Sequence, residues 1–345
     1  MLKKYADLLK EVQENTTDSQ QPDDKVLIID GLNNFIRVFS AISTMNDDGE
    51  HIGGLVGFLK SIAAAIRQHN PTRCIIVFDG HGGSNRRRKL FKGYKSGRFS
   101  KSRLNRSIEY SNVQDEQQSL KAQLYKLIEY LDQLPIHTLS IDNIEADDTI
   151  AYIAKSLITK EVVIMSSDKD FLQLVDHRIN IWSPTKKKLY TPELIKEEYG
   201  ISSTNFIWYR ALDGDKSDNI PGIGGVGLKT LKKYLPILTE DELVDYDKMV
   251  SYIDKQEKSY KLYESIKSSE DTINLNYRLM QLHDVDISGS IKSRIKDIVR
   301  SPIPQLNAFN FKRLFIRDKL YSNISNLEYW LNQSFRPLSR YSTVK

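Results

Sequence analysis

Short apolar runs alternate with amphipathic segments between residues 25 and 168. Three of the runs end in an acidic residue: KVLIID at Asp30, RCIIVFD at Asp79 and EVVIMSSD at Asp168. Between the runs, apolar positions recur at helical spacing over residues 54–68, 115–133 and 146–158. Continuous β-branched runs separated by amphipathic helices are typical of a parallel sheet that helices cover on both faces. The pattern therefore predicts an α/β fold.

A fourth apolar run, IHTLSID, leads into NIEADD, which places Glu145, Asp147 and Asp148 within four residues. Acidic residues in the first turn of a helix complement the positive end of the helix dipole, and one or two satisfy that need. A third acid mainly adds repulsion unless a cation lies among the carboxylates. Taken alone, the segment is a weak sign of a metal site.

The sheet topology strengthens that sign. Ligands of parallel sheets bind beyond the carboxyl ends of the strands, where all the acids that end the apolar runs are expected to lie. Oxygen donors without His or Cys suit hard cations such as Mg²⁺ or Mn²⁺. The six histidines show no spacing typical of metal ligands. The sequence therefore favours a hard divalent cation over zinc.

Composition adds limits on the class of protein. The chain has 345 residues, of which 40% are hydrophobic and 28% charged, and its net charge is +5. It shows neither a membrane-length apolar run nor a secretion signal, so we expect no membrane partner. We also expect a monomer, located in a reducing cytoplasm. Cys74 is the single cysteine of the chain, so a disulfide within the chain is excluded. It lies in a buried-strand pattern.

Positive charge is concentrated in one segment. The run RRRKLFKGYKSGRFSKSRLNR, residues 86–106, contains ten Lys or Arg and no acidic residue. A solvated basic loop is the ordinary explanation of such a run. Here Phe91, Tyr94 and Phe99 interleave with the cations, and this combination favours a surface for single-stranded nucleic acid.

A glycine-rich segment follows the last apolar run. GDKSDNIPGIGGVGLKTLKKYL, residues 214–235, contains Asp215 and Asp218, then four spaced glycines and three lysines. The ordinary explanation is a turn between helices. Glycines before a helix also let backbone amides approach a phosphate closely, which favours contact with a duplex backbone. A phosphate-binding P-loop is not indicated, because the strand-GxxxxGK[ST] arrangement is absent.

The ordered set IDG, VFDG, EADDTIA, SSDKDFLQL and GDKSDNIPGIGGVGLKT resembles the 5′-nuclease superfamily of flap endonucleases and 5′→3′ exonucleases over about residues 25–235. Within this superfamily, the bacteriophage ribonuclease H type looks closest, on the segments SSDKDFLQL, INIWSPTKKKLY and SYKLYESIKSSEDTINLNYRLM. If a phage encodes the chain, the expected location is the host cytoplasm. The resemblance implies a PIN-like parallel sheet flanked by helices, a basic helical arch (about 80–112) and a helix-three-turn-helix (about 213–236). The expected division is a flexible extension (1–24), a nuclease domain (25–200) and a helical C-terminal domain (201–345).

The resemblance also implies the metal ligands. One Mg²⁺ would be held by Asp30, Asp79, Glu145 and Asp147. A second would be held by Asp168, Asp170, Asp215 and Asp218, with Asp147 or Asp148 shared between the two ions. Mn²⁺ would substitute for Mg²⁺, and a K⁺ ion would lie at the helix-three-turn-helix.

Two further groups of residues are implied to contact nucleic acid. Tyr94, Lys95 and Arg98 of the arch would face the scissile phosphate. The expected binding residues are Arg86, Arg87, Arg88, Lys89 and Lys92 in the arch, and Gly222, Gly224, Gly225, Gly227, Lys229, Lys232 and Lys233 in the hairpin. Gly224 stands where the family often has proline, so we expect a slightly looser turn there.

The function implied is a metal-dependent, structure-specific 5′ nuclease that hydrolyses phosphodiester bonds near the 5′ ends of RNA primers and DNA flaps. It would act as a 5′→3′ exonuclease and flap endonuclease with ribonuclease H activity, in lagging-strand primer removal, replication and repair. Its substrates would be branched or nicked duplex DNA and RNA–DNA hybrids with 5′ ends.

Other classes explain less of the sequence. A non-catalytic junction-binding protein would have no reason to keep the carboxylates, and a PIN-type ribonuclease acting on single-stranded RNA would be shorter and lack GDKSDNIPGIGGVG. We expect a free-standing enzyme rather than a nuclease attached to a polymerase, because only about a hundred residues follow the hairpin.

The C-terminal apolar residues have two explanations. The pattern over 302–335 favours core packing in a small helical domain that closes over the nuclease. The alternative is a docking surface for a single-strand-binding protein or a sliding clamp, with residues 1–15 as a second candidate.

Overall fold

A six-stranded sheet forms the centre of the protein. The computed structural model describes residues 21–96 and 103–342, so most of the predicted N-terminal extension lies outside the described residues. The strands lie in the order β3-β2-β1-β4-β5-β6, with bounds β1 Lys25–Asp30, β2 Arg73–Asp79, β3 His137–Ile141, β4 Glu161–Met165, β5 Ile179–Ser183 and β6 Lys188–Tyr190. Strands β1 to β5 run parallel, and β6 pairs antiparallel with β5. The four apolar runs are therefore neighbouring strands, as predicted.

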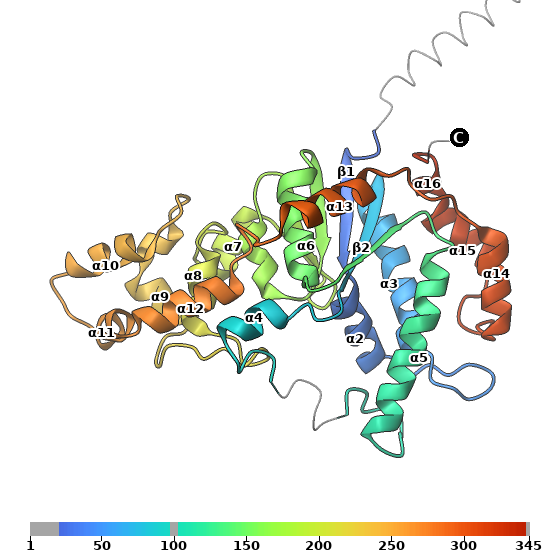
Figure 1. Cartoon of the computed structure of the whole chain (residues 1–345), viewed down its shortest axis with the longest axis horizontal. Coiled ribbons are helices and arrows are strands. Elements are labelled where there is room, and N and C mark those ends of the chain that lie inside the picture. The colour runs from blue at the N-terminus through green and yellow to red at the C-terminus, as the bar shows by residue number, and fades with distance from the viewer. Residues whose placement is uncertain (1–20, 97–102, 343–345) are drawn as a thin grey trace, which may run out of the picture.

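Helices cover both faces of this sheet (Figure 1). Those in the N-terminal part of the chain are α2 (Gly31–Ala41), α3 (Gly53–His69), α4 (Asn85–Leu90), α5 (Val113–Leu131) and α6 (Ala146–Tyr152). Helix α6 continues as the π-helical turn η1 (Ile153–Leu157), and a 3₁₀-helix, η2 (Lys169–Leu174), follows β4. The three predicted helical segments are thus confirmed as α3, α5 and α6 with η1.

The described residues after β6 are mainly helical. They form α7 (Pro192–Tyr199), α8 (Phe206–Asp213), α9 (Leu228–Tyr234), η3 (Pro236–Thr239), α10 (Tyr246–Asp254), α11 (Lys261–Ser268), α12 (Glu270–Met280), α13 (Gly289–Arg300), α14 (Ala308–Arg317), α15 (Leu327–Ser334) and α16 (Arg336–Ser339). Among the described residues, none of the helices combines the length and apolar character needed to cross a membrane.

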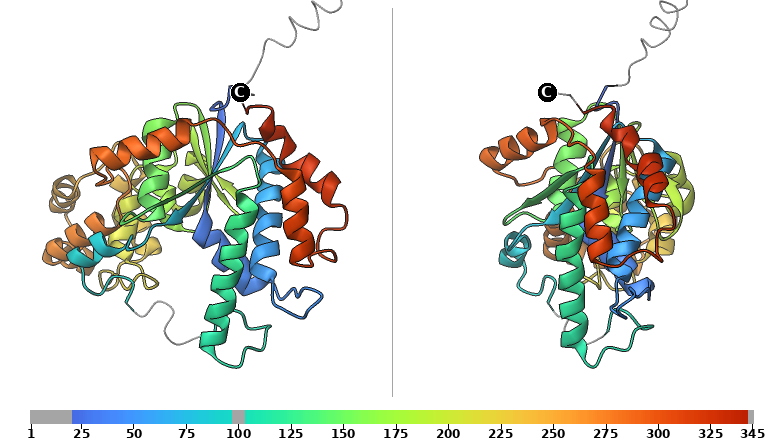
Figure 2. Two further views of the ribbon diagram at one scale, coloured as in Figure 1. Left: turned by 45° about the vertical axis from the view of Figure 1, so that its right-hand side comes forward. Right: turned by 90° about the vertical axis from the view of Figure 1, so that its right-hand side faces the viewer.

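The alternation of side chains along β1 divides the core into two layers. Successive side chains of a strand point to opposite faces of a sheet. Val26 and Ile28 accordingly belong to one buried cluster, and Leu27 and Ile29 to the other. The first cluster includes residues of α6, α8, α12 and α13, and the second includes residues of α2, α3, α5 and α14. Figure 2 shows the sheet between these two sets of helices.

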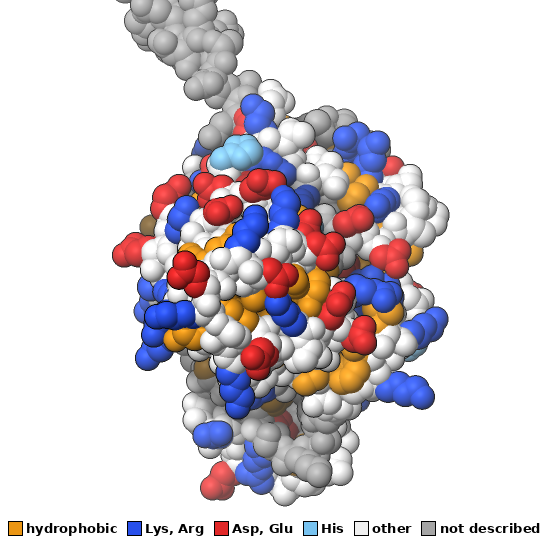
Figure 3. All heavy atoms as spheres, turned by 90° about the vertical axis from the view of Figure 1, so that its left-hand side faces the viewer, with side chains coloured by type: hydrophobic (Ala, Val, Ile, Leu, Met, Phe, Trp, Pro, Cys, Tyr) orange, Lys and Arg blue, Asp and Glu red, His pale blue; other side chains and the backbone are white. Residues whose placement is uncertain are grey.

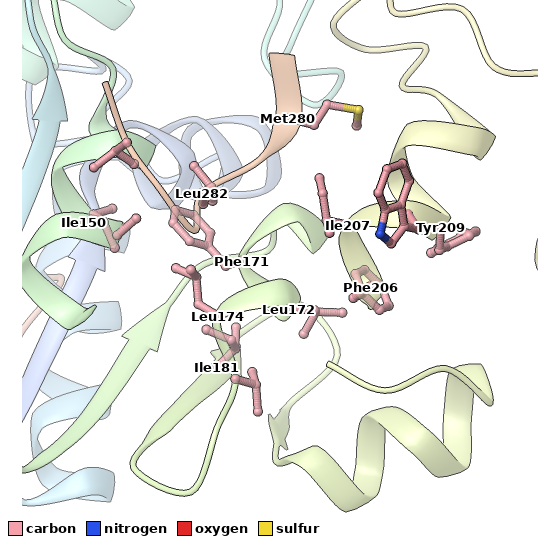
Figure 4. Packing of buried hydrophobic residues seen from close by; sticks show 14 of the residues in the cluster. Ile150, Phe171, Leu172, Leu174, Ile181, Phe206, Ile207, Tyr209, Met280 and Leu282 are labelled. Atoms are coloured by element: carbon pink, nitrogen blue, oxygen red, sulfur yellow. The ribbon is translucent and has the colours of Figure 1, made fainter. Parts of the chain in front are cut away.

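The first layer supports the segment that carries Asp168. Phe171 and Leu172 of η2 pack in the same buried cluster as Phe206 and Ile207 of α8 and Met280 of α12 (Figure 4). Each of these side chains is at most 3% exposed. Apolar packing therefore joins the segment after β4 to the helical region.

The C-terminal helices pack mainly as core, which the sequence favoured over docking. Phe311, Phe315 and Phe335 are buried in the second layer, where α15 contacts α3. Helices α14 to α16 therefore lie on the opposite side of the sheet from α8 to α12 (Figure 1). The apolar faces of residues 201–345 are buried in two different layers, and the expected domain boundary at residue 200 stays a prediction. Phe309 is an exception to the predicted burial, since its side chain is 78% exposed.

A pair of phenylalanines in α14 tests this packing. Phe311 is fully buried with its ring edge-on to Tyr130, at 5.0 Å between ring centroids. We expect Phe311→Ala to lower the free energy of unfolding by about 3–5 kcal/mol, because it removes a large side chain and leaves a cavity. Phe309→Ala is the matched control and should change it by at most about 0.5 kcal/mol. Urea denaturation measures both, and equal losses would contradict the core assignment.

Candidate functional site

Acidic side chains from several strand ends line one cavity. Asp30 ends β1, Asp79 ends β2, and Asp168 follows β4. Together with Asp147 and Asp218 they line a pocket of about 320 Å³. β1 lies between β2 and β4 in the sheet, which explains why the three strand-end acids meet. The predicted convergence of acids at the carboxyl edge is therefore present for Asp30, Asp79, Asp147 and Asp168, and Asp218 joins them from the loop after α8.

Local hydrogen bonds fix the strand-end carboxylates. Asp30 caps α2 by accepting a hydrogen bond from the Asn33 amide at 3.1 Å, and it also accepts one from the Ser166 hydroxyl at 3.0 Å. Asp79 accepts one from the Ala146 amide at 2.8 Å, which ties β2 to the start of α6. Both carboxylates therefore accept a hydrogen bond at a helix N-terminus, where negative charge is favoured.

Burial and mutual repulsion raise the pKa of two acids in the pocket. Burial raises the pKa of Asp30 to about 7, and repulsion from Asp168 and Asp79 adds to it against hydrogen bonds from Asn33 and Ser166. The pKa of Asp147 is raised well above its usual range by burial, then by Asp168 and Asp30. A divalent cation among these carboxylates would favour their ionised forms.

Glu145 is held by cations from the arch. Its carboxylate pairs with the Arg87 guanidinium, lies 2.5 Å from Lys95 Nζ, and accepts a hydrogen bond from the Tyr94 hydroxyl at 3.2 Å. Burial alone would raise the pKa of Glu145, but attraction to Arg87 and Lys95 outweighs it, so the pKa is lowered. Glu145 is thus ionised and already paired.

Asp147 and Asp148 point to different partners. Asp147 lines the pocket, whereas Asp148 receives hydrogen bonds from Arg87 at 2.7 and 3.0 Å and from Arg86 at 3.2 Å. Of the two residues predicted as a shared ligand, only Asp147 therefore faces the pocket. Consecutive residues of a helix diverge by about 100°, which explains the difference.

Arg87 is not at the surface, contrary to the prediction that it binds nucleic acid. It is 3% exposed, and its Nε donates a hydrogen bond to the Leu279 carbonyl of α12 at 2.7 Å. Together with its pairs to Glu145 and Asp148, this contact makes Arg87 a buried link between the arch, α6 and α12. In contrast, Arg88, Lys89 and Lys92 are exposed, as a nucleic-acid surface requires.

Arg210 pairs with the acids that were assigned to a second ion. Its Nε lies 2.5 Å from Asp170, and its Nη2 lies 2.5 Å from Asp215. Burial raises the pKa of Asp170 to about 7, and repulsion from Asp168 adds to it against the attraction of Arg210. Arg210 was not predicted as a site residue, although an arginine inside the apolar segment FIWYRALD indicates a buried charge that needs partners.

The carboxylates do not form a ready-made coordination shell. Across residues 21–96 and 103–342, no group of three or more His, Cys, Asp or Glu side chains is arranged to hold a metal ion. Glu145, Asp148, Asp170 and Asp215 are instead paired with arginine or lysine. The carboxylates that line the pocket nevertheless provide only oxygen donors, which fit a hard divalent cation.

The described part of the arch contains little helix. Helix α4 spans only Asn85–Leu90, turns follow to Ser96, and the chain from residue 103 reaches α5 without another helix. Lys95 lines the pocket, while Tyr94 is 3% exposed and packs in the first core layer. Burial would lower the pKa of Lys95, but Glu145, Asp147 and Asp218 outweigh it and raise the pKa. Arg98 lies outside the described residues.

The glycines of the hairpin serve two purposes. A Cβ on Gly222 would lie 2.0 Å from the Asp213 carbonyl oxygen, so this glycine permits close backbone packing. A Cβ on Gly224, Gly225 or Gly227 would meet no described atom within 4 Å, so these three face open space. Gly225 also has a φ of +79°, a conformation that favours glycine. Only the last three glycines therefore fit the predicted approach to a phosphate.

The lysines after the hairpin differ in their contacts. Lys229 is exposed, Lys233 lies 5.0 Å from the ring centroid of Tyr234, and Lys232 donates a hydrogen bond to the Glu198 carbonyl at 2.9 Å. Figure 3 looks at the end of the molecule that carries α10 and α11, and there Lys and Arg are interspersed with Asp and Glu. That end is not a uniform basic patch.

Comparison with known proteins identifies the relatives of this chain. The family model described as "5'-3' exonuclease, N-terminal resolvase-like domain" matches residues 25–200. A protein named 5'-3' exonuclease from Buchnera aphidicola subsp. Acyrthosiphon pisum is 33% identical over 84% of this chain and 96% of its own length. The 5'-3' exonuclease of Aquifex aeolicus is 31% identical over 76% of this chain and 83% of its own length.

Two further similarities concern a longer protein and a solved structure. DNA polymerase I of Bacillus subtilis is 31% identical over 77% of this chain, but the match spans 29% of the polymerase. The T5 D15 protein, co-crystallized with metal ions, superposes with a TM-score of 0.61 over 85% of this chain and 99% of its own. Its sequence is 18% identical, so this likeness concerns the fold.

The match to the family model and the two exonuclease relatives agree with the motifs and with the fold. The narrower likeness to the bacteriophage ribonuclease H type is not tested by them and stays a prediction. The chain belongs to the 5′-3′ exonuclease family, within the 5′ nuclease superfamily.

Proposed function

We propose that the chain is a divalent-metal-dependent 5′ nuclease that hydrolyses phosphodiester bonds near the 5′ ends of strands in branched or nicked duplex DNA. The observation that carries this proposal is the pocket lined by Asp30, Asp79, Asp147 and Asp168 at the carboxyl edge of the sheet, with Lys95 among its lining residues. Carboxylates supply the sites for cations, and the lysine supplies positive charge for a phosphate.

In the mechanism we propose, the carboxylates that line the pocket, Asp218 included, would hold Mg²⁺ or Mn²⁺, with Mg²⁺ as the ordinary ion. A pair of such ions, when bound, would activate water and stabilise the leaving oxygen. The remaining predicted ligands are Glu145, Asp170 and Asp215, each with an arginine or lysine partner. They would balance the charge of the pocket and orient its lining residues.

Lys95 would contact the scissile phosphate. Its ammonium bonds to Glu145 in the free protein, and its side chain is only 13% exposed at the pocket. A phosphate that enters the pocket would compete with Glu145 for the same ammonium group. Positive charge placed there stabilises the charge that develops on the phosphate oxygens in the transition state.

We infer the substrate class from the protein groups that would contact the phosphates of a nucleic acid. The exposed Arg88, Lys89 and Lys92 and the open glycines of the hairpin offer contacts to phosphates rather than to bases, so recognition would depend on structure rather than on sequence. The T5 D15 flap endonuclease, a structure of similar fold with a TM-score of 0.59, is described in complex with DNA and metal ions. We extend the proposal to RNA–DNA hybrids, ribonuclease H activity and primer removal, with K⁺ at the hairpin.

Metal dependence is the first test of this function. We expect EDTA to abolish cleavage of a 5′-flap duplex and Mg²⁺ or Mn²⁺ to restore it. Asp168→Asn should lower the turnover number by orders of magnitude while substrate binding is retained, because loss of a negative charge relieves repulsion of the phosphate. Asp142→Asn, which alters an exposed acid just beyond β3, is the matched control and should keep full activity. Undiminished cleavage in EDTA would contradict the proposal.

Substitutions of two lysines in the arch test the chemical step and substrate binding separately. We expect Lys95→Ala to lower the single-turnover rate by about 10²–10³-fold with little change in Kd, since a transition-state contact acts on the chemical step. Lys92→Ala should instead weaken binding and reduce its salt dependence, because Lys92 is exposed and would meet a phosphate of the bound strand. Quench-flow cleavage and fluorescence anisotropy measure the two effects. A Lys95→Ala variant that changes Kd alone would show that the lysine only positions the phosphate.

A further inference from the structure

The turn that carries Lys95 is attached to a loop distant in the sequence. The backbone amide of Lys95 donates a hydrogen bond to the Asp218 carbonyl at 2.8 Å. The side-chain amide of Asn219 donates to the Gly93 carbonyl at 3.0 Å and to the Ser96 hydroxyl at 3.1 Å. These contacts join the Gly93–Ser96 turn of the arch to the loop before the glycine hairpin.

The turn holds Lys95 in an unfavourable backbone conformation. Lys95 has a φ of +54°, in the left-handed region that residues with a Cβ rarely adopt. The hydrogen bond from the Ser96 amide to the Gly93 carbonyl, at 3.0 Å, closes the turn around it. Such a conformation persists only where surrounding contacts enforce it, and such residues cluster at functional sites.

The loop from Asp215 to Ile220 offers a rigid base for these contacts. Its ends are joined by two backbone hydrogen bonds, from the Asp215 amide to the Ile220 carbonyl at 2.9 Å and in the reverse direction at 2.7 Å. Asn219 itself has a φ of +60°. A Cβ on Gly93 would lie 3.1 Å from Asn219 Nδ2 and 2.7 Å from the Phe91 ring, so glycine allows the close approach of the two segments.

We propose that Asn219 is a positioning residue that holds the Gly93–Ser96 turn so that Lys95 stands over the acidic pocket. This inference rests on the proposed function, in which Lys95 contacts the scissile phosphate. The loop that carries Asn219 leads directly into the glycine hairpin. Its side chain therefore links the segment that would grip the duplex to the residue that would act on the phosphate.

The substitution Asn219→Gly removes the side-chain amide and leaves the left-handed backbone unstrained. We expect the single-turnover rate at saturating 5′-flap duplex to fall about 10-fold, as the loss of two hydrogen bonds allows, while Kd changes less than twofold. The double variant Asn219→Gly/Lys95→Ala should be no slower than Lys95→Ala alone, since Asn219 acts through Lys95.

Amide hydrogen exchange supplies a readout that does not depend on activity. In the free protein, Asn219→Gly should accelerate exchange of the Lys95 and Ser96 amides about 10-fold, because the turn loses its attachment. Asn70→Gly is the matched control: it changes an exposed asparagine with a φ of +44° at the end of α3, and it should alter neither the rate nor this exchange.

Each outcome decides the inference. A normal cleavage rate in Asn219→Gly beside a slow Lys95→Ala would overturn the role of Asn219 and leave the proposed function intact. Multiplicative losses in the double variant would also overturn it, because they would show that Asn219 acts independently of Lys95. If the unaltered chain fails to cleave any flap substrate with Mg²⁺, the proposed function fails, and unchanged exchange at Lys95 and Ser96 would separately refute the attachment.

Discussion

Repulsion among acidic side chains at the carboxyl edge of the sheet is the constraint on which the other features of this site depend. The raised pKa values of Asp30 and Asp147 show how strongly burial and neighbouring carboxylates oppose ionisation there. A buried charge without a partner costs several kcal/mol. The surrounding elements must therefore bring in positive charge, either from the protein or from bound cations.

The protein's own cations come from elements outside the sheet. Arg87 of α4 reaches Glu145 and Asp148, and its contact with the Leu279 carbonyl fastens the base of the arch to α12. Arg210 of α8 bridges η2 and the loop before the hairpin. These buried pairs, together with the apolar packing in Figure 4, hold the arch and the helical region against the edge that carries the acids. Charge balance at the site and assembly of the fold thus involve the same residues.

Lys95 differs from the two arginines in its position. The two arginines are buried, whereas Lys95 lines the pocket and itself has a left-handed backbone conformation. A lysine has a compact charge on a flexible stem, so it can exchange a carboxylate for a phosphate more readily than a buried guanidinium with several fixed hydrogen bonds. Among the described residues that line the pocket, Lys95 is the basic one, so the proposed contact with the phosphate is assigned to it.

The sequence determined the sheet and the position of its acids, because both follow from local patterns. Continuous apolar runs ending in Asp30, Asp79 and Asp168 define parallel strands, and parallel strands bring their carboxyl ends to one edge. Only the tertiary structure decided which acids face the pocket and which pair with cations. Asp147 and Asp148 are adjacent in sequence, yet the first lines the pocket and the second meets Arg87. The partners of Glu145, Asp170 and Asp215 come from distant segments, and the apolar face of α14 covers a different layer from that of α12. Such choices depend on the orientation of helices across the whole chain, which spacing along the sequence does not specify.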